Sequence, residues 1–334
     1  MNQPHRALFW KKLKDDRVQC SLCPRNCIIA NNSRGNCGVR ENQNGKLYST
    51  VYGRASSYNM DPIEKKPLYH FLPGERTFSL STVGCNLHCL FCQNWEISQC
   101  RPEESEPLVL MPKDVVERTQ KMGSRIVSYT YTEPTIFYEY VTDTAKIAKA
   151  KKVRNVLVSN GFTNPGPLKK LAPLIDAVNV DLKGDKKFYE KVTGAWIEPV
   201  LESLKIYQRK GVWLEITNLL IPGLNDSKKQ IEWLVDWIEE NLGKDVPVHF
   251  SAFWPTYKMQ DTPSTSIKAL RMARKIGMKK LNYVYATLPD DEGNMTYCPK
   301  CRKALIIRKG FSVVENNMKN GKCGCGQKIA GVWN

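Results

Sequence analysis

The amino-acid sequence predicts an α/β protein built on an open, partial TIM-type barrel, with a small cysteine-rich extension at each end. Between about residue 77 and residue 286, short β-rich runs alternate with helical patterns, which is typical of repeated strand–helix units and a parallel sheet. Six or seven such units are fewer than a closed eightfold barrel requires. We therefore expect a (β/α)6 barrel.

We expect this barrel to span residues 63–288, between a metal-binding extension at 1–62 and a second one at 289–334. Seven runs are candidate strands because they are rich in β-branched and aromatic residues. They are residues 77–83, 125–131, 154–160, 177–182, 212–221, 246–251 and 281–286.

Helical patterns separate these runs. One helix is expected to begin near Asn225 and Asp226, and another carries Pro112 in its first turn. In parallel barrels the chemistry lies on loops that follow the carboxyl ends of the strands. The motifs GCNLHCLFCQN, TEPT, SNGF, DLKG and PGLND all follow expected strands, so we expect them to share one site.

The composition indicates a soluble, globular, metal-binding protein. Of its 334 residues, 42% are hydrophobic and 25% are charged, which suffices for a sizeable core. The sequence shows neither a membrane-spanning apolar run nor a signal peptide at its start, so we expect a cytoplasmic protein without a membrane partner. Because that compartment keeps thiols reduced, the twelve cysteines favour metal sites over disulfides.

The formal charge of +17 raises the question of a nucleic-acid partner. The basic residues are spread along the whole chain, as in KKLK near the start and KAKK at 149–152. Solvated helix faces explain such a distribution. A nucleic-acid partner therefore remains an alternative that we do not favour.

The central cysteine motif, Cys85-x3-Cys89-x2-Cys92, directly follows the first expected barrel strand. Three thiolates are one fewer than a [4Fe-4S] cubane needs for full ligation. The open iron can bind the amino and carboxylate groups of S-adenosylmethionine. One electron then cleaves a carbon–sulfur bond and yields a 5′-deoxyadenosyl radical that abstracts hydrogen. We expect these three cysteines to be the catalytic cluster ligands.

A zinc knuckle is the alternative for this motif, with His88 or Cys100 as the fourth ligand. Phe91, an aromatic residue directly before the last cysteine, favours the iron–sulfur interpretation. We therefore interpret His88 as a loop residue and Cys100 as a thiol that binds no metal.

Near the C-terminus, Cys298-x2-Cys301 and Cys323-x-Cys325 form two turn-like pairs about 20 residues apart. They predict a zinc-ribbon or rubredoxin-like knuckle with four thiolates around one tetrahedral ion, which we expect to be zinc. The second pair lacks one residue of the usual spacing. A reduced, metal-free hairpin is the alternative.

At the other end lie four closely spaced thiols, Cys20, Cys23, Cys27 and Cys37. They suit zinc or an auxiliary iron–sulfur cluster, and we favour zinc. A small extension with few apolar residues would gain much of its stability from such a metal.

The segment GCNLHCLFCQNWEIS resembles the radical S-adenosylmethionine superfamily, in particular the branch of pyruvate formate-lyase activating enzyme and its AmmeMemoRadiSam-type members. The similarity continues through CSLCPRNC, CGVREN, KPLYHFLPG, YTEPT, VSNGF, NVDLKG, EITNLLIPGLND, HFSAFWP and YCPKC, and so covers nearly the whole chain. It implies an oxidoreductase of the activating-enzyme type. A radical RNA-modifying enzyme is the alternative.

The same resemblance implies partners. These are a reductant such as ferredoxin or flavodoxin, a substrate that is a protein, and two companion proteins. It also implies that Phe91 lies near the adenine of bound S-adenosylmethionine. Thr132 and Glu133 stand where the family has a glycine-glycine-glutamate segment that receives the methionine amino group. Here the sequence reads Tyr131-Thr132-Glu133-Pro134, so a side-chain oxygen can replace the backbone contact.

Further polar residues at strand ends are candidates for S-adenosylmethionine contacts. Ser159 and Asn160 suit a ribose hydroxyl or the carboxylate, or else form a turn with Gly161. Asp181 and Lys183 resemble an element in which the lysine pairs with the methionine carboxylate, and strand alternation points both to the same side. A surface salt bridge is the alternative for this pair.

Three further polar residues, two of them within expected strands, are candidates for buried positions. His249 is a candidate for a substrate or S-adenosylmethionine contact, or else a core histidine. Glu215 is expected to point into the barrel cavity or to form a structural ion pair, because an unpaired buried carboxylate is costly. His70 is either structural or close to the substrate.

Overall fold

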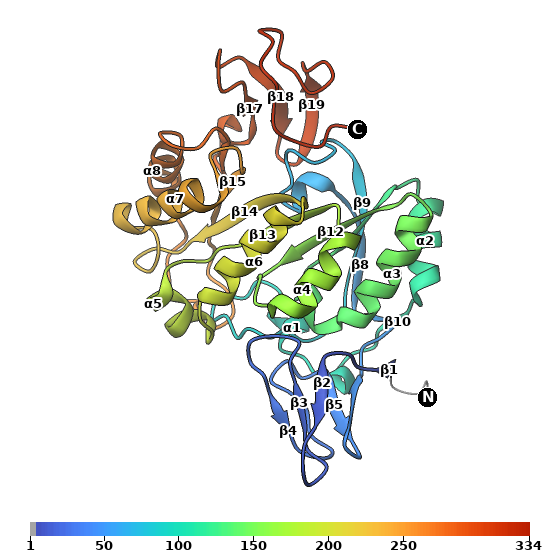
Figure 1. Ribbon diagram of the computed structural model, residues 1–334. Coiled ribbons are helices and arrows are strands. Elements are labelled where there is room, and N and C mark those ends of the chain that lie inside the picture. Colours follow the sequence, from blue (N-terminus) through green and yellow to red (C-terminus); the bar gives the residue numbers. More distant parts are fainter. Residues whose placement is uncertain (1–4) are drawn as a thin grey trace.

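The computed structural model describes residues 5–334 and is organised around an eight-stranded sheet (Figure 1). The strand order is β16-β15-β14-β13-β12-β11-β9-β8, and every neighbouring pair from β9 to β16 is parallel. The parallel strands are β9 (Arg76–Ser81), β11 (Ile126–Tyr129), β12 (Arg154–Ser159), β13 (Ala177–Asp181), β14 (Trp213–Leu220), β15 (Val248–Ala252) and β16 (Val284–Ala286). Each matches one of the seven expected runs. The predicted partial α/β barrel is therefore confirmed.

Six helices connect these strands and cover one face of the curved sheet (Figure 1). They are α2 (Pro112–Lys121), α3 (Tyr138–Ala150), α4 (Pro165–Leu171), α6 (Glu198–Arg209), α7 (Lys228–Leu242) and α8 (Ile267–Gly277). The short helices α1 (Trp95–Ser98) and α5 (Lys186–Phe188) lie in connecting loops. Six strand–helix units and a final strand thus form the barrel.

The start of α7 differs from the sequence-based expectation. Its N-cap is Ser227, whose hydroxyl accepts a hydrogen bond from Gln230 N at 3.3 Å. Asn225 instead ties the preceding loop, since its Oδ1 accepts from Ile221 N at 2.6 Å. Asp226 likewise accepts from Gly223 N at 2.9 Å. Both residues shape the turn before the helix rather than cap it.

The strand β8 (Ser57–Pro62) extends the barrel sheet on the other side of β9 and runs antiparallel to it. It lies within residues 1–62, which we assigned to the N-terminal extension. The barrel sheet therefore begins at Ser57, before the expected boundary. The expectation was wrong here because alternation alone cannot say which sheet a strand joins.

The rest of the N-terminal segment forms small sheets beside the carboxyl ends of the barrel strands (Figure 1). One contains β1 (His5–Arg6), β6 (Lys46–Ser49) and β5 (Arg40–Gln43), another contains β2 (Trp10–Lys12), β3 (Val18–Cys20) and β4 (Ile28–Ile29), and a third pairs β7 (Arg54–Ala55) with β10 (Leu108–Val109). The buried guanidinium of Arg40 binds Glu139 of α3, with Nη1 and Oε1 at 3.0 Å. This ion pair anchors the N-terminal segment to the barrel.

The C-terminal segment lies at the opposite end of the barrel (Figure 1). Its sheet contains β17 (Thr296–Tyr297), β18 (Ala304–Lys309) and β19 (Ser312–Asn316). Val332 pairs with Phe71, and Arg308 Nη2 donates to Tyr69 O at 2.7 Å. The segment therefore covers residues 69–72, which close the amino end of the barrel. Within residues 5–334, no helix combines the length and apolarity needed to cross a bilayer.

Candidate functional site

A cavity of about 550 Å³ lies inside the barrel, and the three cysteines of the central motif form part of its wall. Cys85, Cys89 and Cys92 all line it, in the loop that follows β9. Seven of the eight residues expected to bind S-adenosylmethionine line the same cavity: Phe91, Thr132, Glu133, Ser159, Asn160, Asp181 and Lys183. They come from the ends of β11, β12 and β13 and from the cysteine loop, which is why one cavity collects them.

Burial strongly affects the cysteine thiols. It raises the pKa of Cys89 to about 12, although nearby Lys183 opposes this rise, and it raises the pKa of Cys85 well above its usual value. Without a cation these thiols would stay protonated at neutral pH. Bound iron supplies the positive charge that lets such groups ionise, so the environment fits a metal-dependent site better than a reactive free thiol.

Two polar side chains contact the cysteine sulfurs. Asn160 Nδ2 lies 3.8 Å from Cys85 Sγ and donates to Asn86 Oδ1 at 2.9 Å. Ser98 Oγ lies 3.2 Å from Cys92 Sγ. Donors to cluster sulfurs tune the reduction potential. The amide of Asn160 therefore contacts the cysteine loop, and its contact with the ribose or carboxylate of S-adenosylmethionine stays a prediction.

Glu133 organises the neighbouring strand end. Its Oε1 accepts from Thr135 N and Ser159 Oγ, both at 2.9 Å, and its Oε2 accepts from Asn160 N at 2.7 Å. Burial raises the pKa of Glu133 even though these donors stabilise the carboxylate. Ser159 thus supports Glu133 in this structure, while Thr132 Oγ1 donates to Thr82 O at 2.8 Å.

Asp181 and Lys183 form the pair that strand alternation predicts. Lys183 Nζ lies 2.8 Å from Asp181 Oδ2 and 5.5 Å from the centre of the Phe91 ring. Burial alone would lower the pKa of Lys183, but Asp181 and Cys89 outweigh it and raise the pKa. The pair lines the cavity, so it is not the surface salt bridge that we considered as the alternative.

Neither alternative fourth ligand lines this cavity. The two ring nitrogens of His88 lie 2.8 Å from Gln99 Oε1 and 2.9 Å from Asn36 Oδ1, so both already have partners. Cys100 Sγ donates to Arg101 O at 3.2 Å. His88 is thus a loop residue that contacts the N-terminal segment.

His249 has the contacts of the core histidine that we gave as one of its two interpretations. His249 does not line the cavity, and its ring packs against the rings of Tyr69 and Tyr285. Its Nε2 lies 2.7 Å from Glu215 Oε2. Glu215 also accepts from the backbone N–H groups of Tyr69 and His70, at 2.9 and 2.8 Å. Glu215 forms the structural pair that we considered, and it fixes the segment that closes the barrel.

His70 is structural as well. Its Nδ1 lies 2.6 Å from Ala330 O and its Nε2 lies 2.5 Å from Tyr285 Oη. Burial lowers the pKa of His70 to about 4. A neutral ring that donates to the carbonyl and accepts from the hydroxyl satisfies both contacts.

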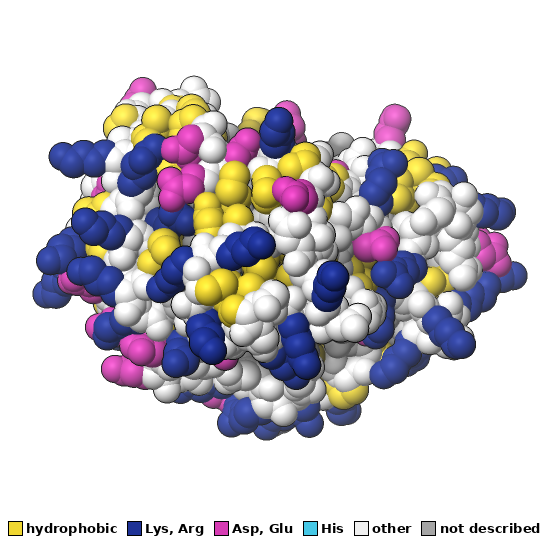
Figure 2. Space-filling model, turned by 90° about the horizontal axis from the view of Figure 1, so that it is seen from above, with side chains coloured by type: hydrophobic (Ala, Val, Ile, Leu, Met, Phe, Trp, Pro, Cys, Tyr) yellow, Lys and Arg dark blue, Asp and Glu magenta, His cyan; other side chains and the backbone are white. Residues whose placement is uncertain are grey.

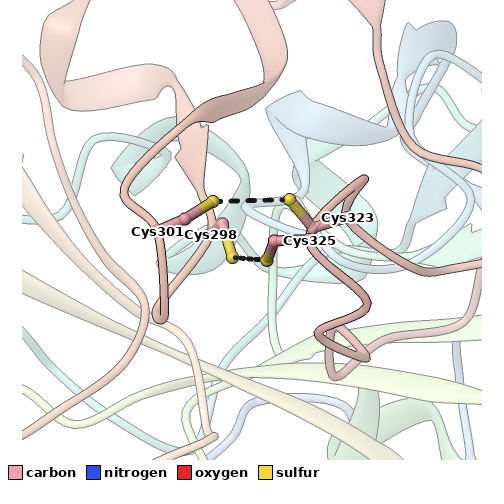
Figure 3. A group of neighbouring side chains, drawn as sticks. All are labelled: Cys298, Cys301, Cys323 and Cys325. Carbon is pink, nitrogen blue, oxygen red and sulfur yellow. Dashed lines mark hydrogen bonds between the residues drawn. The ribbon is translucent and has the colours of Figure 1, made fainter.

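The four C-terminal cysteines face one another across two loops (Figure 3). Within residues 5–334, they are the one group of three or more His, Cys, Asp or Glu side chains whose ligand atoms all lie within 4.8 Å of one another. Cys298 Sγ and Cys325 Sγ are 3.7 Å apart, and Cys301 Sγ and Cys323 Sγ are 3.6 Å apart. A tetrahedral ion with metal–sulfur bonds of about 2.3 Å requires sulfur–sulfur distances of about 3.8 Å. The quartet therefore fits a single ion.

The four N-terminal cysteines, Cys20, Cys23, Cys27 and Cys37, line one small cavity together with Arg40. Burial raises the pKa of Cys23 to about 12 and that of Cys37 to about 11. The Nε atom of Arg40 is buried without a hydrogen-bond partner among the described residues. A buried cation beside four thiols favours thiolates, but no three of these sulfur atoms lie within 4.8 Å of one another, as those of the C-terminal quartet do.

The N-terminal segment packs directly on the catalytic loop. A Cβ at Gly84 would lie 2.7 Å from Cys37 O and 2.6 Å from Val39 Cγ1. Gly84 has φ +94° and immediately precedes Cys85. Only glycine fits this close approach, which brings the first and second cysteine groups together.

Several polar residues around the cavity were not expected from the sequence. Asn86, Asn94 and Ser98 surround the cysteine loop, and Lys66 and Tyr131 line the cavity. The first three lie within or just beyond the cysteine motif, so proximity in sequence was the available signal. Lys66 lies between β8 and β9, outside the loops that follow the parallel strands, so the strand-end argument did not apply to it.

Comparisons with known proteins agree with this geometry. The model of the Radical SAM superfamily matches residues 79–238. An uncharacterized protein of Methanocaldococcus jannaschii is 44% identical over 328 residues, which cover 97% of this chain and 98% of that protein. The pyruvate formate-lyase-activating enzyme of Clostridium pasteurianum is 25% identical over 171 residues, 50% of this chain and 71% of that enzyme.

A similar solved structure is that of a radical SAM methyltransferase from Sphaerobacter thermophilus, with a TM-score of 0.51 and 16% sequence identity. The similarity covers 65% of this chain and 67% of that one. This comparison supports the shared fold. The chain belongs to the radical S-adenosylmethionine superfamily.

Proposed function

We propose that this protein reductively cleaves S-adenosylmethionine and uses the resulting 5′-deoxyadenosyl radical to abstract hydrogen from a substrate, as activating enzymes do. The observation that carries this proposal is the shared cavity. Cys85, Cys89 and Cys92 line it together with Glu133 and Lys183, and neither His88 nor Cys100 reaches it. Three cysteines without a fourth protein ligand suit a [4Fe-4S] cluster with one open iron.

When bound, that cluster would supply the electron that cleaves the sulfonium. The protein supplies position and charge. Lys183 presents an ammonium group to the cavity for the methionine carboxylate, while Asp181 holds it in place. Glu133 is buried and fixes the ends of β11 and β12 against each other. Phe91 covers one side of the cavity and leaves an apolar surface for adenine.

The direct test is product formation. Anaerobically reconstituted protein with a strong reductant should convert S-adenosylmethionine to 5′-deoxyadenosine and methionine. Cys89→Ala should abolish this, and Cys100→Ala should not, because Cys100 lies outside the cavity. Absence of 5′-deoxyadenosine from wild-type protein with an intact cluster would refute the proposal.

The two terminal cysteine groups support additional metals in this proposal. For the C-terminal quartet we favour zinc, because its sulfur–sulfur distances suit one tetrahedral ion. For the N-terminal quartet, the unpartnered Arg40 Nε supports a metal–thiolate centre with negative charge, and zinc remains our preferred ion. A ferredoxin or flavodoxin would deliver the electron, and companion proteins would accompany a protein substrate.

An RNA substrate is the second candidate, which the charge of +17 favours. Figure 2 shows Lys and Arg side chains spread over the end of the molecule that carries the C-terminal segment, with Asp and Glu between them. Such scattering favours ordinary solvated surface over a nucleic-acid groove. Salt-sensitive tRNA binding would support the RNA alternative, and no binding at low salt would remove it.

A further inference from the structure

The cavity continues well beyond the residues that we assign to S-adenosylmethionine. Lys65, Lys66 and Pro67 also line it, as does Phe311 from the C-terminal segment. Ile63 N donates to Glu75 O at 2.9 Å, directly before β9 begins. Residues 65–67 therefore lie near the amino end of β9, whereas the cysteine motif follows its carboxyl end. The cavity thus extends along the strand from the cysteines to a separate, lysine-lined end.

Lys66 is the unusual residue at this end. It is 1% exposed, its Nζ lies 2.7 Å from Asp61 Oδ2, and it stands 4.3 Å from the centre of the Tyr131 ring. An ammonium group has three donors. Among residues 5–334, Asp61 is the single hydrogen-bond partner of Lys66 Nζ. Two donors remain for an acceptor that enters the cavity.

Asp61 cannot satisfy those donors as well. Its two oxygens accept from Lys65 Nζ at 3.1 Å, from Lys66 Nζ, and from Tyr131 Oη. Burial would raise the pKa of Asp61, but the contacts with Lys66 and Tyr131 outweigh burial and lower it. Two lysines against one carboxylate leave a net positive charge. This end of the cavity is therefore suited to an anion.

Tyr131 holds its ring at this site at a conformational cost. Its φ is +65°, in the left-handed region that bulky residues avoid. Asn94 Nδ2 donates to Tyr131 O at 2.8 Å and fixes this backbone. The ring lines the cavity, and its hydroxyl contacts Asp61. Glycine would adopt this backbone without strain but has no side chain. The strained tyrosine instead provides the contacts of its ring with Lys66 and of its hydroxyl with Asp61.

Burial lowers the pKa of Lys66 to about 8, although Asp61 favours the charged form. A single carboxylate therefore compensates the buried ammonium incompletely. A second anion beside Lys66 would complete the compensation, which agrees with the two unused donors.

We propose that Lys66 and Tyr131 form the substrate-anchoring end of the cavity and bind an oxyanion of the substrate, a carboxylate or a phosphate. This inference rests on the proposed function, because it assumes that a substrate extends from this end toward the cysteines. The anchored anion would fix the distance between the reacting carbon and S-adenosylmethionine. Lys66 then determines specificity and does not take part in the hydrogen abstraction.

Equilibrium dialysis of reconstituted, S-adenosylmethionine-loaded full-length protein tests this site. The probes are radiolabelled succinate and inorganic phosphate at constant ionic strength, which separate the carboxylate from the phosphate source. Wild-type protein should bind one of them at one site per chain. Lys66→Met should weaken binding at least tenfold, whereas the matched variant Lys113→Met, at an exposed lysine outside the cavity, should weaken it less than threefold.

Wild-type protein that binds neither probe would overturn the inference, and so would Lys66→Met that binds as tightly as wild type. Because Lys66→Met can misfold, crystals of wild-type protein soaked in selenate give a second test. Selenate with an oxygen within hydrogen-bond distance of Lys66 Nζ, located by its anomalous selenium peak, supports the site, and selenate bound elsewhere alone refutes it.

Formation of 5′-deoxyadenosine by the same preparations separates this inference from the proposed function. Protein that forms 5′-deoxyadenosine without binding either anion refutes the anchoring site alone. Protein that binds an anion but forms no 5′-deoxyadenosine, with its cluster intact, refutes the proposed function and leaves the anion site supported.

Discussion

The central cysteine triad and the C-terminal cysteine quartet differ in the spacing of their sulfur atoms and in the space beside them. In the quartet, four sulfur atoms lie within 4.8 Å of one another, on loops at the covered end of the barrel (Figure 3). In the triad, Cys85, Cys89 and Cys92 line a cavity of about 550 Å³ with other polar side chains. The first arrangement has the spacing for a single ion, and the second leaves space for a larger group and its ligand.

This difference predicts separate roles in stability and in catalysis for the two cysteine groups. A closed tetrahedral site has no open position and stabilises the fold. A site with three thiols and a neighbouring cavity leaves a position for an exchangeable ligand. The quartet should therefore matter for stability and the triad for chemistry, and both halves of this statement can be tested.

Substituting one cysteine in each group should give the largest difference in activity. Cys89→Ser should lower 5′-deoxyadenosine formation by at least ~10³-fold, because the cluster loses a ligand. Cys301→Ser should lower the rate per bound cluster by less than tenfold, and its main effect should be on thermal unfolding. Measuring both rates per mole of cluster iron tests the division. Equal losses in the two variants would contradict it.

Metal removal should show the same division. The double variant Cys298→Ser/Cys301→Ser should bind one divalent ion fewer per chain than wild type and have a free energy of unfolding lower by several kcal/mol. Acid-labile sulfide and the iron of the triad should remain. Metal analysis of Cys298→Ser gives the matched result, in which one ion is missing and sulfide is unchanged. A parallel loss of sulfide would show that the quartet holds part of a cluster.

The packing of the N-terminal segment on the triad gives a third prediction. Gly84→Ala should destabilise the protein by about 3 kcal/mol, since it adds a backbone clash to the strain of φ +94°. Gly123→Ala is the matched control, with φ +74° and no atom within 4 Å of the added Cβ. It should cost about 1 kcal/mol. Equal costs by denaturant unfolding would refute the close contact with Cys37.

The smallest effect concerns His70, on the quartet side of the barrel. Its pKa is about 4 in the folded protein, below the ordinary 6.5. The unfolded chain therefore binds more protons between these values, and stability falls as the pH drops through 6.5. Between pH 7.5 and 5.5 the loss should be about 1 kcal/mol. His70→Gln should show a smaller loss in denaturant unfolding, and an unchanged pH dependence would contradict this assignment.

The barrel could be predicted from the sequence because each parallel strand is a short, buried, β-rich run. All seven expected strands are present, with bounds that differ by at most three residues. The two- to four-residue strands of the N-terminal segment were not predicted, since runs such as Lys46–Ser49 carry little periodic signal. Their arrangement follows from tertiary contacts with the barrel, such as the pair of Arg40 and Glu139.

The site could be predicted in part for a related reason. Glu133, Asn160 and Lys183 follow strands, so the strand-end rule brings them together. Lys66 and Tyr131 meet through a contact between segments far apart in the chain, which no local pattern reveals. His249 could not be assigned from the sequence, because a strand pattern does not reveal its contact with Glu215.

The central claim is that the triad leaves one iron open for S-adenosylmethionine. Electron-nuclear double resonance of the reduced protein, loaded with S-adenosylmethionine labelled with 15N at the amino group and 17O at the carboxylate, tests it directly. If one iron binds S-adenosylmethionine, both labels should show hyperfine coupling. This coupling should be absent in Cys89→Ser. A fully cysteine-ligated cluster that shows no coupling to either label would contradict it.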